Sequence, residues 1–206
     1  MRTFIRIISG TLRGRKVGCT VTESLRPTPQ MVREAFFSIL GNAIPNRVFV
    51  DIFAGTGVVG MEAMSRGATQ TLFIERDAQF AKDIESHLRT FELMRQSKLY
   101  RTDSYRWIAA WVAPKEPVNV FLSPPFVDLT ERTDVLFEAL QQLQAKVAED
   151  SVIVVQTETG SPLDDALPDW ERRKYGRNEL LIWQREIQNL STKDTKGHEG
   201  EEEAAI

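Results

Sequence analysis

Residues 48–60 read Val-Phe-Val-Asp-Ile-Phe-Ala-Gly-Thr-Gly-Val-Val-Gly, a short apolar run that ends at an acid and then breaks into glycines. The three glycines, Gly55, Gly57 and Gly60, fit the pattern G-x-G-x-x-G. Because they lack side chains, they permit a tight turn and let a ligand approach the backbone. A helical stretch follows and ends at Arg66-Gly67. The run therefore predicts a strand, a Gly-rich turn and a helix, which open a βαβ unit.

Polar side chains end several of the predicted strands. Asp51 and Glu75 each end an apolar run, and Asp103 and Ser123 directly follow two further runs. Glu75 comes about 20 residues after the glycines, where dinucleotide-binding folds place an acid for ribose hydroxyls. Because ligands of α/β sheets bind beyond the carboxyl ends of the strands, we expect these four residues to share one rim. The pattern indicates a site for a nucleoside-containing cofactor.

Strands and helices alternate through most of the chain, which is typical of a doubly wound, mostly parallel α/β sheet. Other strands are predicted at 71–74, 98–101, 118–122 and 152–155, and helices at 30–40, 77–93, 107–111 and 133–146. Two closing strands, 170–175 and 179–183, are joined by a very short turn. They must be antiparallel, because parallel neighbours need a long crossover. A small β unit is predicted ahead of the sheet, with a strand at 4–8 and a second strand or loop at 11–17.

Composition limits the possible class of protein. The 206 residues are 42% hydrophobic, enough for one core, and no stretch approaches 18 apolar residues, so no membrane span is predicted. The single cysteine, Cys19, excludes an internal disulfide, and the N-terminus lacks a secretory signal. His87 and His198 have no neighbours at metal-ligand spacing, so no metal site is predicted. The expectation is a cytoplasmic, metal-free monomer.

Charge is distributed unevenly along the chain. Through residue 40 there are seven basic and two acidic residues, a net of +5, whereas from Glu186 onward there are two basic and six acidic residues, a net of −4. A basic extension favours a phosphate-bearing partner, although a solvated face is the alternative. These shifts predict three parts: a basic extension at 1–43, a cofactor-binding domain at 44–187 and an acidic, disordered tail at 188–206.

The most specific chemical signal is Ser123-Pro124-Pro125-Phe126, which follows a buried strand. Two prolines stiffen an extended turn and remove two backbone donors, so their carbonyl groups can point at a ligand. The serine oxygen and a proline carbonyl can then accept hydrogen bonds from an exocyclic amine, while the phenylalanine stacks on the base. A proline-stiffened loop beside a core phenylalanine is the structural alternative.

Taken together, these motifs resemble the S-adenosylmethionine-dependent amino-methyltransferases, which carry [DNS]-P-P-[YFW] after the fourth strand. More narrowly, the chain resembles the bacterial RsmD-type family, which methylates N2 of a guanine in small-subunit (16S) ribosomal RNA. The stretches that carry this likeness are Arg6–Arg15, Leu25–Thr28, Val32–Phe37, Phe53–Gly57, Glu62–Ala68 and Tyr175-Gly176. The resemblance covers nearly everything except the tail, and it implies a Rossmann-like methyltransferase domain at 44–187.

The resemblance also implies a role for each matching residue. S-adenosyl-L-methionine would be held at its methionine half by Asp51, Gly55 and Gly57, at its ribose by Glu75 and at its adenine by Asp103. The guanine would be held by Ser123, Pro124 and Phe126, and RNA phosphates by Arg13, Arg15 and Lys16. The partner would be ribosomal RNA or the assembling small ribosomal subunit. The chain departs from the family at Ser123, where the family usually has aspartate, and at Phe126, where it often has tyrosine.

Three functions remain open at this point. The leading one is an RNA guanine-N2 methyltransferase. An NAD-dependent oxidoreductase would be compatible with the glycines and Glu75 alone, but it explains neither Ser-Pro-Pro-Phe nor the basic extension. A non-catalytic or altered-specificity binder of ribosomal RNA is compatible with the serine at position 123. Methyl transfer from labelled cofactor into ribosomal RNA, followed by mapping of the modified base, separates the three.

Overall fold

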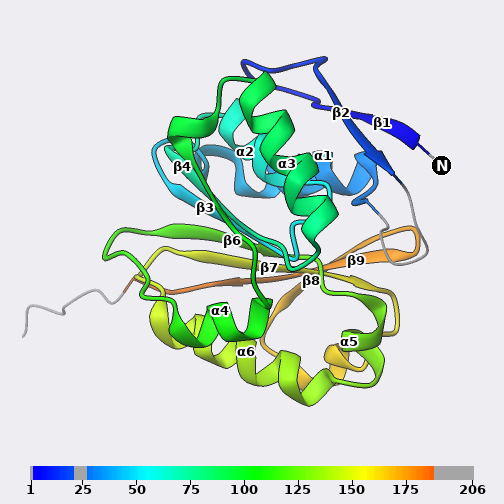
Figure 1. Cartoon of the computed structure of the whole chain (residues 1–206). Helices are drawn as coiled ribbons and strands as arrows, with labels where there is room; N and C mark the ends of the chain where they lie inside the picture. The colour runs from blue at the N-terminus through cyan, green and yellow to red at the C-terminus, as the bar shows by residue number, and fades with distance from the viewer. Residues whose placement is uncertain (1, 21–26, 188–206) are drawn as a thin grey trace, which may run out of the picture.

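The computed structural model describes residues 2–20 and 27–187, which form a seven-stranded sheet flanked by helices and a separate two-stranded sheet (Figure 1). The strands are β1 (Arg2–Arg6), β2 (Lys16–Thr20), β3 (Val48–Ile52), β4 (Gln70–Ile74), β5 (Ser97–Tyr100), β6 (Val118–Leu122), β7 (Val152–Glu158), β8 (Glu171–Tyr175) and β9 (Asn178–Gln184). The α-helices are α1 (Gln30–Leu40), α2 (Val58–Ser65), α3 (Ala78–Thr90), α4 (Ser104–Ala110), α5 (Phe126–Thr130), α6 (Thr133–Lys146) and α7 (Leu163–Ala166). Two 3-10 turns, η1 (Gly41–Ala43) and η2 (Met94–Gln96), complete the list.

The large sheet has the order β5-β4-β3-β6-β7-β9-β8. Neighbours from β5 to β7 are parallel, whereas β9 is antiparallel to both β7 and β8. The predicted doubly wound sheet with a closing antiparallel hairpin is therefore confirmed. The chain runs outward from β3 to β5 and then returns to β6 on the other side of β3. This reversal puts a crevice between the carboxyl ends of β3 and β6, where ligands of such sheets bind.

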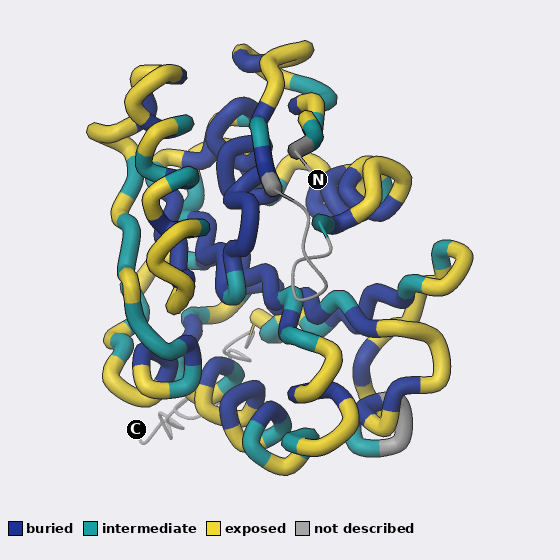
Figure 2. Tube along the Cα trace, turned by 45° about the vertical axis from the view of Figure 1, so that its right-hand side comes forward, coloured by how far each residue is buried: buried dark blue, intermediate teal, exposed yellow. Residues whose placement is uncertain are grey.

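Helices cover both faces of the sheet. Figure 1 shows α1, α2 and α3 on one face and α4, α5 and α6 on the other. Side chains alternate between the two faces along each strand, so Phe49 and Phe121 pack toward α1 and α2 whereas Val50 and Val120 pack toward α4 and α6. β6 is buried along its whole length, and the central strands form the dark interior of Figure 2. Burial on both faces is the reason that these strands read as continuous apolar runs.

Gly60 shows why the third glycine of the motif is required. A Cβ atom there would lie 2.3 Å from Cε1 of Phe73 and 2.8 Å from Cγ2 of Thr71, both on β4. The absence of a side chain therefore lets α2 lie directly on the sheet. Gly57 has a φ of +70°, so it supplies the left-handed conformation at which the turn enters α2.

Strands β1 and β2 form an antiparallel pair that packs over α2 and α3, and we call residues 2–20 the N-terminal arm (Figure 1). The predicted strand at 4–8 is shifted, because Ile7 leaves the ladder and is buried in the core while its amide donates to the carbonyl of Arg15. The arm is fixed to the end of α2 by the amide of Leu12, which donates to Oγ of Ser65 at 2.9 Å. His87 on α3 is half-buried, and its Nε2 lies 2.8 Å from the carbonyl oxygen of Gly18.

A buried ion pair also joins the arm, α1 and α2. Arg33 on α1 is 2% exposed, and its Nε lies 3.4 Å from Oε2 of Glu62, which is fully buried on α2. The same guanidinium donates to the carbonyl oxygens of Arg6 and Thr28, each at 2.9 Å. Burial lowers the pKa of Arg33 and Glu62 opposes that shift. Arg33 therefore connects β1, the segment that contains Thr28, and the helix that follows the glycines. We call this arrangement the Arg33–Glu62 hub.

Two short helices, α5 and α7, were not predicted. The expected helix at 77–93 is shorter than predicted, since Asp77 is its N-cap and accepts from the amides of Gln79 and Phe80. The predicted tail at 188–206 lies outside the described residues, as does Arg26 of the basic extension. Within the part of the chain that the structure describes, no helix has the length and apolarity needed to span a membrane.

Candidate active site

A cavity of about 820 Å³ opens at the carboxyl edge of the sheet, over the crevice between β3 and β6. It is large enough for a nucleoside cofactor and part of a second molecule. Six of the predicted site residues line it: Asp51, Gly55, Glu75, Ser123, Pro124 and Phe126. They come from the carboxyl ends of β3, β4 and β6, which lie at one edge of the sheet as predicted.

Glu75 holds the Gly-rich turn in place. Its Oε2 accepts a hydrogen bond from the amide of Gly55 at 2.8 Å, and its Oε1 accepts from the amide of Asp77 at 2.8 Å. A carboxylate has about four lone-pair positions, so each oxygen can accept one more bond. Glu75 is 8% exposed and lines the cavity, which leaves that remaining capacity facing a ligand. It suits hydroxyl donors such as those of a ribose.

Asp51 is a buried carboxyl group at the base of the cavity. It is 2% exposed, and its Oδ2 accepts a hydrogen bond from the amide of Gly60 at 2.9 Å. Burial raises the pKa of Asp51 from its ordinary value of 3.8 to about 8; the Gly60 amide opposes this shift and the nearby Glu75 adds to it. Two neighbouring acids in one crevice favour a ligand that brings positive charge or hydrogen-bond donors.

The raised pKa of Asp51 predicts a specific pH dependence. Between about pH 4 and pH 8 the unfolded chain releases the Asp51 proton whereas the folded chain retains it, so this group lowers the free energy of unfolding as the pH rises. Asp51→Asn should remove that contribution and make the dependence of unfolding free energy on pH flatter between about pH 4 and pH 8. Urea denaturation of the ligand-free protein across this window measures the difference. Equal slopes for Asp51→Asn and wild type would contradict the prediction, and Glu149→Gln, at a surface acid outside the cavity, is the control.

The segment Ser123–Phe126 crosses the cavity beside the end of β6. The Ser123 amide donates to the carbonyl of Ile52 at 3.3 Å, which ties this segment to β3. Pro124 is buried, Ser123 is half-buried and Phe126 is 62% exposed. Phe126 begins α5. Asp128 of this helix accepts a hydrogen bond from the hydroxyl of Tyr105 on α4 at 2.7 Å, which joins the two helices. The phenylalanine ring is therefore not part of the core and is free to stack on a ligand.

Several lining residues were not predicted as site residues. Thr28, Gln156, Thr157 and Asn178 line the wall beyond Ser123, and Arg76, Phe80 and Arg177 also line the cavity. One signal could have revealed Gln156 and Thr157, because they directly follow the apolar run 152–155 just as Ser123 follows the run 118–122. Thr28 lies in a proline-rich segment and Asn178 is the first residue of β9, so only the tertiary fold brings them to the site.

The other predicted residues lie elsewhere. Asp103 is the N-cap of α4, with its Oδ1 3.1 Å from the amides of Tyr105 and Arg106, and it is its neighbour Ser104 that lines the cavity. Gly57 faces α3, since a Cβ there would lie 2.9 Å from Cγ1 of Ile84.

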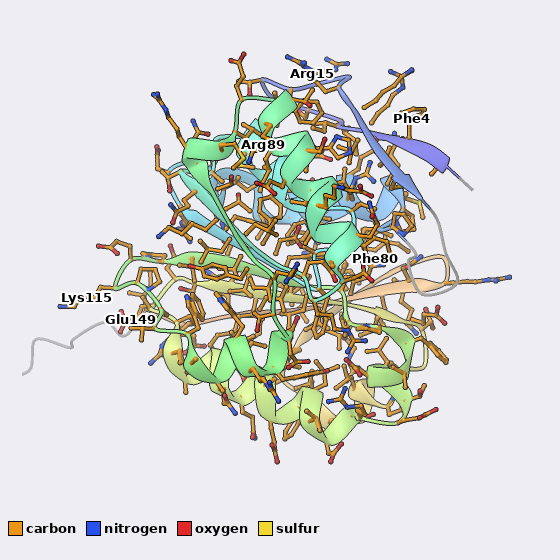
Figure 3. All side chains as sticks on the ribbon, in the orientation of Figure 1. Phe4, Arg15, Phe80, Arg89, Lys115 and Glu149 are labelled. Carbon is orange, nitrogen blue, oxygen red and sulfur yellow. The ribbon has the colours of Figure 1, made fainter. Side chains whose placement is uncertain are left out.

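The basic residues of the arm, Arg13, Arg15 and Lys16, are exposed and do not line the cavity. Figure 3 shows Arg15 at the outer end of the arm, well away from Phe80. Two of them lie over aromatic rings: the Arg15 guanidinium is 5.4 Å from the Phe91 ring centroid, and Nζ of Lys16 is 5.7 Å from that of Phe4.

The donor set fits a cationic nucleoside better than a metal or a pyrophosphate. The cavity lining includes four acids, Asp51, Glu75, Asp77 and Glu158, against two bases, Arg76 and Arg177. It also includes Gly55, which leaves the backbone open, and the half-buried residue Ser123. A pyrophosphate would be repelled by Asp51 once ionised and by Glu75. Within residues 2–20 and 27–187, no three His, Cys, Asp or Glu side chains are grouped in a way that could hold a metal ion.

Comparison with known proteins gives a consistent result. The model of the family described as Conserved hypothetical protein 95 matches residues 5–184. The chain is 31% identical over 195 residues to the ribosomal RNA small subunit methyltransferase D of Escherichia coli K12, covering 92% of this chain and 94% of that protein. It is 34% identical over 167 residues to the protein of the same name from Haemophilus influenzae, covering 77% and 81%. A solved structure from Thermus thermophilus superposes with a TM-score of 0.69 at 28% identity, covering 89% of this chain and 99% of that one.

Proposed function

This chain belongs to the family described as Conserved hypothetical protein 95, the RsmD-type family that its sequence resembles, and we propose that it is an RNA methyltransferase. It transfers a methyl group from S-adenosyl-L-methionine to the exocyclic N2 of a guanine in small-subunit (16S) ribosomal RNA. One observation carries the proposal: Ser123–Phe126 lines the same cavity as Asp51 and Glu75. In this proposal the amine acceptor site and the nucleoside-cofactor site share one cavity, as direct transfer between two bound molecules requires.

Each residue has a defined task in this reaction. S-adenosyl-L-methionine supplies an electrophilic methyl group on a cationic sulfur. Glu75 takes the ribose hydroxyls, Asp51 takes the donor groups of the methionine half, and the Gly55 turn leaves the backbone open to it. On the other side of the cavity, the Ser123 oxygen and the Pro124 carbonyl accept from the guanine amine, and Phe126 stacks on the ring. Catalysis is then mostly orientation and charge stabilisation.

Transfer of a labelled methyl group into ribosomal RNA, with mapping of the modified base, tests the proposed function. The expected result is a single methylated guanine at N2. Calorimetry forms a second arm, in which S-adenosyl-L-methionine and its demethylated product should bind whereas NAD should not. Tight NAD binding without a response to S-adenosyl-L-methionine would overturn the proposal in favour of an oxidoreductase. Cofactor and RNA binding without any transfer would indicate a ribosomal RNA binder instead.

The N-terminal arm is proposed as the RNA-binding part. Arg13, Arg15 and Lys16 are exposed on one strand and its preceding turn, and two of them rest on aromatic rings. Ordering a long side chain on a ring before binding reduces the entropy lost on contact with a phosphate. The arm adds affinity for the nucleic acid without contributing the groups that transfer the methyl.

Replacing Arg13, Arg15 and Lys16 with alanine should weaken RNA binding and flatten its salt dependence. If each side chain contacts one phosphate, the slope of log K against log salt should fall by roughly three, about one per lost contact. Cofactor affinity should stay unchanged, because none of the three lines the cavity. The measurement is RNA affinity across a series of salt concentrations.

A matched control removes the same charge from another surface. Lys98, Arg101 and Lys115 are exposed, and Figure 3 shows Lys115 on the side of the molecule away from Arg15. Their replacement with alanine should leave the slope near its wild-type value. Equal slopes for the arm variant and wild type would mean that the arm is only a solvated face.

A further inference from the structure

A chain of hydrogen bonds crosses the cavity wall beyond Ser123. The Thr28 hydroxyl donates to Oε1 of Gln156 at 2.8 Å, and Nε2 of Gln156 donates to Oδ1 of Asn178 at 3.0 Å. All three residues line the cavity, and they come from the segment before α1, from β7 and from β9. The Arg33–Glu62 hub holds this wall from behind, since Arg33 donates to the carbonyl of Thr28. The Gln156 carboxamide is therefore fixed at both of its ends.

Strand register places Gln156 beside Ser123. Leu122 pairs with Val155 in the parallel ladder of β6 and β7, so the next residue on each strand is Ser123 and Gln156. Neighbouring strands lie about 4.8 Å apart, and side chains that alternate in phase leave the sheet on the same face. A ligand amine bound at Ser123 therefore has the Gln156 carboxamide about one strand spacing away. That distance is comparable to the separation of the 2- and 6-substituents of a purine.

The direction of the hydrogen bonds from Thr28 to Gln156 and from Gln156 to Asn178 determines which groups are left for a ligand. The Gln156 oxygen is occupied by Thr28, and one Nε2 hydrogen is occupied by Asn178. Each carboxamide oxygen keeps one lone pair, and Gln156 keeps its second N–H, which within the described residues is the donor that this side chain has left for a ligand. Thr157, next along β7, lines the same cavity and is 2% exposed, and its hydroxyl has no hydrogen-bond partner among the described residues. By the same alternation Thr157 leaves β7 on the face opposite to Gln156, so its hydroxyl marks a separate polar position of the cavity, since buried polar groups are normally paired.

We propose that Gln156, fixed between Thr28 and Asn178, recognises O6 of the target purine and so selects guanine. This rests on the proposed function, because it needs the 2-amine to be bound at Ser123 and Pro124. A donor at Gln156 then pairs with the guanine O6 acceptor. It opposes any base that carries an amine at position 6, since two donors face each other and neither is satisfied. Gln156 is a specificity residue rather than a methyl-transfer group.

The test compares two purines that share the reacting amine. The substrate is a ribosomal RNA fragment that carries, at the mapped target, either guanine or 2,6-diaminopurine, in which O6 is replaced by an amine. Wild type should methylate the guanine fragment faster by on the order of 10- to 100-fold, as expected for one well-placed base contact. Gln156→Leu should lose most of this ratio, and Gln156→Glu, which presents an acceptor, should shift it toward diaminopurine. Gln184→Leu, at the far end of β9, is the matched control and should keep the wild-type ratio.

The outcomes distinguish this inference from the proposed function. Equal wild-type rates on the two fragments would overturn the O6 contact while leaving the guanine methyltransferase intact. An unchanged ratio in Gln156→Glu would overturn it as well, and an unchanged ratio in Gln156→Leu would do the same if Gln156→Glu does not fold. If wild type methylates no guanine at all, the proposed function fails and the inference fails with it.

Discussion

Replacing Ser123 with alanine should lower the single-turnover rate of methyl transfer by on the order of 10- to 1,000-fold, the effect of deleting one oriented hydrogen-bonding group at a transition state. The guanine amine is a poor nucleophile because its lone pair is conjugated with the ring. As it attacks, the nitrogen becomes more tetrahedral and builds positive charge before its proton leaves. An acceptor aimed at its N–H groups stabilises that charge and holds the lone pair in line.

The same reasoning predicts a gain from Ser123→Asp. A serine oxygen supplies only a dipole, whereas an aspartate supplies a full charge, so the variant should methylate faster than wild type. Single-turnover transfer at saturating cofactor is the measurement, since binding effects then drop out. Phe126→Ala is the companion variant. If Ser123→Ala matches wild type while Phe126→Ala is inactive, the serine is structural and its catalytic assignment is wrong.

Replacing Glu62 with alanine should destabilise the fold by about 3–5 kcal/mol, the usual result of removing one partner from a buried ion pair. Glu62 is fully buried, and it accepts from Arg33 and, at 2.9 Å, from Arg66. Without it, Arg33 remains charged in the core, held only by the carbonyls of Arg6 and Thr28. The free energy of unfolding in urea measures the loss.

Two comparisons separate an ion-pair effect from a general loss of packing. The double variant Arg33→Met/Glu62→Leu should be more stable than Glu62→Ala, because no unpaired charge is left buried. Glu85→Ala removes an exposed ion pair of α3, in which Arg89 and Glu85 are 68% and 44% exposed, and it should cost less than about 1 kcal/mol. Equal losses for Glu62→Ala and Glu85→Ala would contradict the importance given to the Arg33–Glu62 hub.

The fold was predictable from sequence because its signals are local and repeated. Buried parallel strands give continuous apolar runs, and the hairpin of β8 and β9 follows from a two-residue turn that no crossover could replace. The elements that were not predicted correctly also have physical explanations. The helices α5 and α7 have five and four residues, too few for a 3.6-residue period to appear. Ile7 leaves its strand because a tertiary contact buries it, which no local pattern reports.

Some residues of the candidate site were also predictable from sequence, and others were not. Asp51, Glu75 and Ser123 were accessible to prediction because strand ends of a parallel sheet converge on one rim. Asp103 also follows a predicted strand, but its carboxylate is the N-cap of α4. An acid directly before a helix can accept hydrogen bonds from the free backbone amides of the first turn. Thr28 and Asn178 meet Gln156 from segments that are 128 and 22 residues away along the chain, and only tertiary structure can join them.

The position of β9 has a consequence for how the protein is made. This strand is the last of the described strands to be synthesised, yet it inserts between β7 and β8 and begins with Asn178. Asp51 and Glu75 emerge from the ribosome more than a hundred residues earlier than Asn178. A nascent chain can therefore carry the Asp51 and Glu75 side of its cavity while the opposite wall still lacks Asn178. Competence to select a base is expected to arrive in one late step, when the closing hairpin folds.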